Sequence, residues 1–162
     1  MNKRITEMRL QKESRSLENE PIPSVLVHRQ DLLNFHFCFY GLEEEYSQGF
    51  YHGLLELPED YPFSPPKIKF FTNSGRFEVN KSICTTFTHY HKETWSSTWN
   101  IRNILTAMVS FMYSQERGIG GVFETPARRK QLAAKSLAEN LHNPKFVEYF
   151  KDKLIEKELI TS

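Results

Sequence analysis

The chain has 162 residues, of which 21 are basic and 20 acidic, so its formal net charge is +1. This balance excludes a global field that favours nucleic acid or an anionic membrane. An aromatic content of 14%, with 13 Phe, excludes an intrinsically disordered chain. The two cysteines, far apart in sequence, form neither a disulfide framework nor a zinc-ligand spacing. With no apolar run typical of a signal peptide or membrane span, the sequence predicts a single domain, residues 1–162, in a reducing, cytoplasmic compartment.

The first predicted element is an amphipathic helix over residues 2–18, a segment dense in Lys, Arg, Glu and Gln. Ile5 and Met8 are spaced i, i+3, and we expect them to dock one helical face while the charged neighbours stay in solvent. Pro21 and Pro23 end the helix because proline cannot continue it.

Residues 24–58 predict three strands and residues 67–71 a fourth, from the alternation of apolar and polar side chains. In the second strand every other side chain is aromatic: Phe35, Phe37 and Phe39. Gly49 and Gly53 lie in the third strand. Because glycine weakens a strand, we expect a ring or another backbone to pack closely against both. Cys38 is expected to be a small buried hydrophobe.

A proline-rich loop begins at Pro58 and includes Pro62, Pro65 and Pro66. Each proline fixes φ and removes an N–H donor, so the loop is stiff and cannot join the interior of a sheet. It holds Phe63 in one place. The role that the residues alone suggest for Phe63 is a ring that this rigid connection feeds into the core.

Residues 74–99 contain the second cysteine. Ile83 and Cys84 are followed by polar threonines, and this run is too short and too polar for a buried strand. The pattern indicates a thiol presented on a loop, where reactive groups commonly lie. A zinc site of Cys84, His89 and His91 is disfavoured because it lacks a fourth ligand. A Cys–His protease is disfavoured because its nucleophile opens a helix, and the threonines after Cys84 are poor helix formers.

Three helices are predicted after this segment. The first has apolar residues at helical spacing over residues 101–112 and begins at an N-cap from Asn100 or an earlier serine. Thr125 caps the second, which has proline at its first position. The basic residues of that helix, Arg129 among them, are expected to face solvent. Pro144 opens a last amphipathic helix. The apolar stripe of the second helix is Leu132, Ala133, Leu137 and Leu141.

These motifs, in this order, resemble those of the ubiquitin-conjugating enzymes: a Tyr-Pro-Phe-x-Pro-Pro turn at residues 61–66, a strand, a Gly turn, an Ile-Cys site at 83–84, a Trp loop and a helix. Residues 72–77 and 91–95 resemble the turn and Trp loop of the J-type branch, which is associated with the endoplasmic reticulum. The resemblance covers about residues 5–141. It implies an α+β fold with an N-terminal helix, a four-stranded antiparallel meander and C-terminal helices.

The resemblance also implies a chemistry for Cys84. This residue would accept ubiquitin as a thioester from the ubiquitin-activating enzyme and pass it to a substrate protein, helped by a RING-type ligase. A thiolate suits that task because it can attack, hold an acyl group and leave again. No metal and no organic cofactor are implied. The residues that match the family's ligase-binding positions are Lys3, Arg4, Phe63 and Thr98. For Phe63 the resemblance implies an exposed anchor for the ligase, and this role is favoured over a core ring because aromatic anchors on rigid loops make good hot spots.

The chain departs from the family around the cysteine. Most members take an oxyanion donor, worth roughly 3–4 kcal/mol, from a His-Pro-Asn motif that is absent here. Asn73, Ser74 and Asn80 are the candidate donors, with Ser74 standing where J-type members carry Asn. His91 matches the family histidine and is either a proton acceptor or a loop histidine bonded to backbone. The loop 95–99 lacks the proline of relatives, and we expect it to be looser.

The alternative of another class is a non-catalytic adaptor that binds ubiquitin or a partner enzyme. The displaced Asn and the altered Trp loop favour it, whereas Cys84 argues against it because such adaptors lack the cysteine. J-type relatives act in the degradation of proteins from the endoplasmic reticulum and carry a membrane anchor after a linker. The resemblance therefore predicts a role in that degradation, at the cytosolic face of the endoplasmic reticulum if an anchor follows Ser162.

Overall fold

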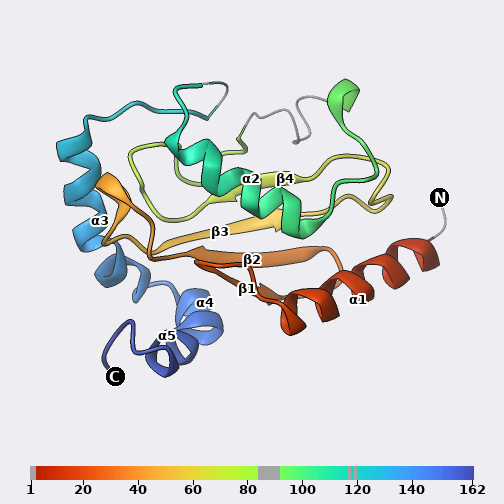
Figure 1. The fold of residues 1–162 in the computed structure, drawn as a ribbon, viewed down its shortest axis with the longest axis horizontal. Helices are drawn as coiled ribbons and strands as arrows, with labels where there is room; N and C mark the ends of the chain where they lie inside the picture. The colour runs from red at the N-terminus through yellow and green to blue at the C-terminus, as the bar shows by residue number, and fades with distance from the viewer. Residues whose placement is uncertain (1–2, 84–91, 117, 119) are drawn as a thin grey trace.

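The computed structural model describes residues 3–83, 92–116, 118 and 120–162. Figure 1 shows a helix at the N-terminal end, a four-stranded sheet, and helices on both sides of that sheet. In chain order the elements are α1 (Lys3–Asn19), β1 (Val25–Arg29), β2 (Asn34–Phe39), η1 (Glu44–Tyr46), β3 (Tyr51–Glu56), β4 (Lys67–Phe70), η2 (Lys92–Thr94), α2 (Ile101–Tyr113), α3 (Pro126–Asn140), α4 (Pro144–Phe146), the π-helix η3 (Val147–Lys151) and α5 (Asp152–Glu156).

The strands form one antiparallel sheet in the order β1-β2-β3-β4, which confirms the predicted meander. Gly53 faces Phe37 across β2 and β3, and a Cβ on Gly53 would lie 2.3 Å from the Phe37 ring. The ring of Tyr51 leaves as little room beside Gly49, where a Cβ would lie 2.0 Å away. At each position a neighbouring ring leaves no room for a Cβ, so the close packing of rings against both glycines is confirmed. The strand bounds are shorter than expected, since β3 begins at Tyr51 and β4 ends at Phe70.

Helix α1 docks through a different face from the one that its apolar residues indicate. Its buried residues are Thr6, Leu10 and Glu13, spaced i, i+4, i+7. Ile5 is 47% exposed and Met8 61% exposed, so the prediction that these two side chains dock the helix is wrong. Two of the three buried positions are polar, and their side chains are satisfied by hydrogen bonds to neighbouring elements. A search for apolar periodicity cannot find such a face.

Helix α2 covers one face of the sheet (Figure 1) and forms the main core with it. Of the predicted alternatives for the N-cap, Asn100 is the one that caps the helix, its side-chain oxygen accepting from the backbone N–H of Asn103 at 2.8 Å. The buried side chains of α2 follow the helical spacing expected from the sequence: Ile101, Ile104, Leu105, Met108 and Met112.

Helix α3 begins as predicted, with the Thr125 hydroxyl accepting from the N–H of Arg128 at 3.1 Å and proline at the first position. Two side-chain predictions for this helix are wrong. Arg129 is only 7% exposed rather than solvated, and Leu141 is 40% exposed rather than in the core. Arg129 is buried because its guanidinium bonds to two backbone carbonyls and pairs with Glu45, all outside α3. Helical periodicity does not encode such contacts.

The C-terminal segment α4, η3 and α5 covers the other face of the sheet (Figure 1). Its apolar side chains pack with two from the strands, forming a second cluster of Leu26, Cys38, Phe146, Phe150 and Leu154. Cys38 is fully buried, as predicted, and burial raises the pKa of its thiol. Because both faces of the sheet are covered, the polar side chains on this second face, His36 and His52, are fully buried as well.

Candidate active site

The predicted nucleophile, Cys84, and the two histidines after it, His89 and His91, lie outside the described residues. The residues on either side of them, up to Ile83 and from Lys92 onward, define the surroundings of the site. Within the described parts of the chain, no group of His, Cys, Asp or Glu is arranged to hold a metal ion.

The residues that lead into Cys84 are held in place from two sides. The backbone N–H of Ile83, a fully buried residue, donates to the carbonyl of Ile68 on β4 at 2.9 Å. On the other side lies Gly120, where a Cβ would come within 2.8 Å of the Ser82 carbonyl oxygen. Gly120 has φ +83°, a conformation that glycine adopts readily. The position before the cysteine is thus set by β4 and by the loop that precedes α3.

The three candidate oxyanion donors occupy different environments. Asn73 is exposed, and its Oδ1 accepts from the N–H of Gly75 at 3.1 Å. Its Nδ2 group, which an oxyanion donor would use, takes no part in this bond. Asn80 is exposed and has φ +61°, a left-handed conformation that asparagine tolerates. Ser74 is fully buried, and its hydroxyl oxygen accepts from the N–H of Arg76 at 3.2 Å. Asn73 and Asn80 therefore present amides to solvent, whereas the Ser74 hydroxyl belongs to a turn.

Two loops meet where the ligase-binding residues are predicted. Phe63 is 52% exposed on the proline-rich loop, so its ring is not fed into the core. The indole Nε1 of Trp95 donates to the carbonyl of Pro62 at 2.8 Å and joins that loop to the Trp loop. Thr98 is exposed, and its Oγ1 lies 2.9 Å from the Oγ of Ser96, which also accepts from the Thr98 N–H. Ser96 thus ties the loop that lacks the family's proline.

A buried carboxylate, that of Glu13, joins α1 to the proline-rich loop and to the start of α2. One oxygen accepts from the N–H of Ile101 at 2.7 Å, and the other accepts from the Tyr61 hydroxyl at 2.7 Å and from Arg9 Nε at 2.8 Å. Arg9 also donates to the carbonyl of Trp99 at 2.8 Å. Burial and the nearby Glu13 carboxylate raise the pKa of Tyr61. These bonds make α1, the proline-rich loop and the start of α2 one connected unit.

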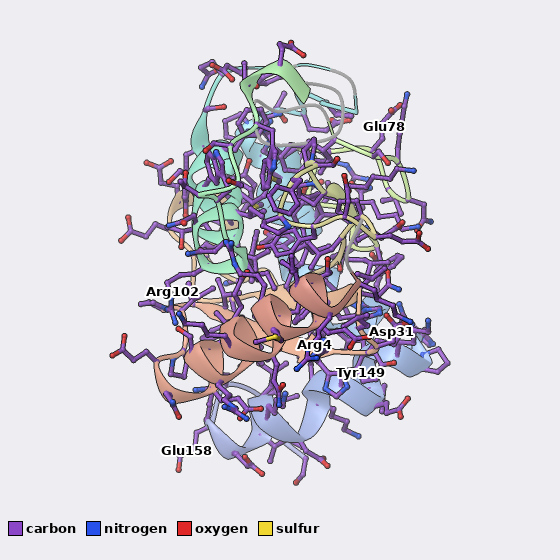
Figure 2. All side chains as sticks on the ribbon, turned by 90° about the vertical axis from the view of Figure 1, so that its right-hand side faces the viewer. Arg4, Asp31, Glu78, Arg102, Tyr149 and Glu158 are labelled. Atoms are coloured by element: carbon purple, nitrogen blue, oxygen red, sulfur yellow. The ribbon has the colours of Figure 1, made fainter. Side chains whose placement is uncertain are left out.

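The basic start of α1 lies at the same end of the molecule. Lys3 is exposed with its Nζ 4.0 Å from the Glu7 carboxylate, and Arg4 is exposed on α1, which crosses the front of the view in Figure 2. The Thr6 hydroxyl donates to the carbonyl of Tyr61 at 2.8 Å and fixes α1 against the proline-rich loop. The four predicted ligase-binding residues therefore come from elements that share one end of the fold (Figure 1).

Sequence reasoning missed the residues that hold this end together. Arg9 and Glu13 are spaced i, i+4, a spacing that favours an ion pair on a helix. The same pattern is common on solvated helix faces, so it does not by itself indicate burial. The partners of Glu13 that decide its burial lie 48 and 88 residues further along the chain, at Tyr61 and Ile101.

Comparison with known proteins gives consistent matches. A family model described as ubiquitin-conjugating enzyme matches residues 9–142. The chain is 37% identical over 145 residues to ubiquitin-conjugating enzyme E2 34 of Arabidopsis thaliana, covering 88% of this chain and 61% of that protein. It is 34% identical over 145 residues to ubiquitin-conjugating enzyme E2 J2 of Mus musculus, covering 88% and 56%. The chain thus spans about three fifths of these curated relatives. Among solved structures, human ubiquitin-conjugating enzyme E2 G1 shares the fold, with a TM-score of 0.60 and 22% identity over 69% of this chain and 97% of that one.

Proposed function

This chain belongs to the ubiquitin-conjugating enzyme family, and from that premise we propose that it accepts ubiquitin from the activating enzyme as a thioester on Cys84 and transfers it to a substrate protein. The observation that carries the proposal is the state of the other cysteine. Cys38 is fully buried among apolar side chains, and its raised thiol pKa suppresses the nucleophilic thiolate. Of the two cysteines in the chain, Cys84 is therefore the one suited to thioester chemistry.

The transfer step needs a donor for the oxyanion that forms when an acceptor attacks the thioester. We assign this role to Asn73 or Asn80, because both are exposed and lie on the segment that leads into Cys84. Burial makes Ser74 the weakest of the three candidates. His91 is the proposed proton acceptor for the attacking group, since a neutral imidazole accepts protons near neutral pH.

The proposed ligase surface consists of Lys3, Arg4, Phe63 and Thr98. The hydrogen bonds of Glu13 and Trp95 support it, because they hold the three contributing elements in one arrangement. A preformed surface loses little conformational entropy on binding. The proposed partners are the activating enzyme, ubiquitin, a RING-type ligase and the substrate.

The resemblance to the J-type branch supports a role in degradation associated with the endoplasmic reticulum, with the chain acting at its cytosolic face. One relative, E2 J2 of Mus musculus, bears the J-type name. Among the described residues, no helix combines the length and the apolar character that crossing a bilayer requires.

The test is a thioester assay with purified activating enzyme, ATP and ubiquitin, run with and without reductant. We expect a reductant-sensitive adduct on the wild type, and a reductant-resistant ester on Cys84→Ser because an oxygen ester is not cleaved by thiols. Cys38→Ala is the matched control and should load normally. A folded wild type that gives no adduct would refute the transfer function and favour an adaptor.

The oxyanion donor is tested separately on loaded protein. Asn80→Gly removes the amide and keeps the left-handed backbone at that position, and Asn73→Ala removes the other amide. Loss of the true donor should slow discharge to free lysine by a factor on the order of 10²–10³ while loading stays intact. If neither variant slows discharge, the donor lies elsewhere.

A further inference from the structure

Arg76, which precedes Cys84 by eight residues, is fully buried. Its Nη2 donates to the carbonyls of Phe111 and Glu116 and to the hydroxyl of Ser114, the first and last of these at 3.3 Å. Its Nε and Nη1 have no hydrogen-bond partner among the described residues. None of the ion pairs found between those residues includes Arg76, although the charge of Glu116 acts on it from beyond ion-pair distance. The guanidinium is therefore a buried cation whose hydrogen-bond acceptors are two backbone carbonyls and one hydroxyl.

Aromatic rings surround the same guanidinium. Its Cζ lies 4.8 Å from the ring centres of Phe77 and Phe123 and 4.9 Å from that of Phe111. Such contacts compensate part of the lost hydration. A buried charge without a carboxylate is nevertheless weak evidence for stability, since an apolar side chain of similar volume often serves the fold as well. What Arg76 achieves is a connection, because its acceptors lie 35 to 40 residues away in sequence.

Arg129 makes the matching connection from α3. Unlike Arg76 it has a carboxylate partner, with Nη1 3.4 Å from Glu45. Its Nε donates to the carbonyl of Gly75 at 3.1 Å and its Nη2 to the carbonyl of Val122 at 3.3 Å. The two arginines thus bind the segment around residues 75–77 to the described residues of the 114–124 loop, Arg76 near its start and Arg129 near its end.

The loop in turn contacts the chain next to Cys84. Phe77 pairs with Gly121, and the N–H of Glu78 donates to the carbonyl of Gly120 at 2.8 Å. Gly120 is the residue that packs against the Ser82 carbonyl. The position of the loop therefore determines how Gly120 packs against Ser82, two residues before Cys84.

We propose that Arg76 is a positioning residue for ubiquitin transfer: it holds the described residues of the 114–124 loop against residues 77–82, which lead into Cys84. This inference rests on the proposed function. Loading of the thiol is a simple exchange, whereas discharge requires the thioester, the acceptor and the oxyanion donor to be aligned. Discharge is therefore the step that a displaced loop impairs, since a misplacement of about 1 Å can cost about 10²-fold in rate.

The test compares Arg76→Met, Arg76→Lys and, as a matched control, Arg128→Met at an exposed arginine of α3. The loaded fraction is measured first, then the single-turnover discharge rate over a series of lysine concentrations. For Arg76→Met we expect full loading, a saturating rate about 10- to 100-fold lower and an unchanged half-saturating concentration. Arg76→Lys, which keeps the charge among the rings, should recover most of the rate, and Arg128→Met should match the wild type.

Hydrogen exchange separates positioning from loss of fold. Arg76→Met should speed exchange of the Glu78 and Val122 amides, whose acceptors are Gly120 and Arg76, and leave β2 protected. If Arg76→Met does not fold, Phe123→Ala serves instead, because it removes a partly exposed ring from the same guanidinium, and it should slow discharge without altering loading. A folded variant that loads and then discharges at the wild-type rate overturns the positioning role alone. A wild type that never loads overturns the proposed function, and the positioning role with it.

Discussion

The two faces of the sheet are buried by different chemistry. On the face under α2, aromatic rings pack directly on one another, with the Phe37 and Phe70 rings 5.3 Å apart edge to face and the Phe70 and Phe77 rings stacked at 5.2 Å. On the face under the C-terminal helices, two histidines lie in the middle of the packing, with His36 Nδ1 2.8 Å from His52 Nε2. The stability of the first face comes mainly from the packing of rings, whereas that of the second depends also on the protonation state of two imidazoles.

The hydrogen bonds of the second face assign the histidine tautomers. Gln30 Oε1 accepts from Lys145 Nζ and the Tyr149 hydroxyl and lies 2.8 Å from His36 Nε2, so that nitrogen carries the proton. His36 Nδ1 then accepts from His52 Nε2–H, and the remaining nitrogen of His52 has no partner among the described residues. Both rings are therefore neutral. Burial is the main reason that the pKa of His36 falls to about 4 and that of His52 to about 3.

Tyr149 on η3 covers the histidines at the edge of the second face. The Tyr149 ring stacks on His28 of β1 at 4.0 Å and meets His36 edge to face. In Figure 2 Tyr149 and Asp31 lie toward the same edge of the molecule, where the C-terminal helices meet the β1–β2 turn. A polar face of this kind aligns the helices on the sheet through specific bonds, whereas the apolar face provides mainly burial.

The largest effect is expected from Phe37→Ala on the apolar face. This fully buried ring contacts two other rings and Gly53, and its removal should lower the free energy of unfolding by about 3–5 kcal/mol. Denaturant unfolding measures the change. The control is Phe63→Ala, which removes an exposed ring and should change stability by less than about 0.5 kcal/mol. Equal losses for the two variants would contradict the assignment of Phe37 to the core.

Phe150→Ala on the polar face should cost less, about 2 kcal/mol, because the C-terminal helices can undock while the rest stays folded. The Phe150 ring is fully buried and packs against His52 with centres 5.5 Å apart. Hydrogen exchange should show faster exchange in α5 than in β2. Leu159→Ala, at a 40% exposed position, is the control. Uniform loss of protection in α5 and β2 would show that the two faces unfold together.

Acid should weaken the polar face. Because the pKa values of His36 and His52 in the folded protein lie below the ordinary 6.5, their contribution to stability is complete above pH 6.5 and is lost as pH falls toward 4 and 3. We expect the free energy of unfolding to fall across that window, and denaturant unfolding at a series of pH values measures the loss. His52→Gln keeps the donor to His36 and does not titrate, so its stability should fall less over the same range. Parallel curves for variant and wild type would contradict this account.

The smallest effect on stability is expected at the N-terminus of α2, the helix that covers the apolar face. Asn100→Ala removes the bond to the Asn103 N–H and should cost about 1 kcal/mol, measured by thermal unfolding. Asn100→Ser, which retains a capping oxygen, should recover most of that loss. A loss above about 3 kcal/mol would indicate that Asn100 has a further role in the Trp loop.

Much of the candidate site could be named from the sequence, although its supporting contacts could not. The Pro-rich turn, Cys84 and the Trp loop are local motifs, so their residues were identified together with the family. The sequence did not reveal the structural roles of Arg9, Glu13 and Arg76. A charged side chain is expected to face solvent unless its partners in the fold are known. For Arg76 those partners lie on α2 and the loop after it.

The sequence by itself determined the order of the four strands and of α1, α2 and α3, because their signals are local. It predicted one last helix where the structure has α4, the π-helix η3 and α5 in succession. The caps of α2 and α3 act over three residues, and the strand alternation repeats every second residue. Only the tertiary structure decided which face of α1 docks and which polar side chains, His36 and Arg129 among them, are buried. The physical reason is that burial of a polar group is favourable only where distant parts of the chain supply its hydrogen bonds, and no local pattern records that supply.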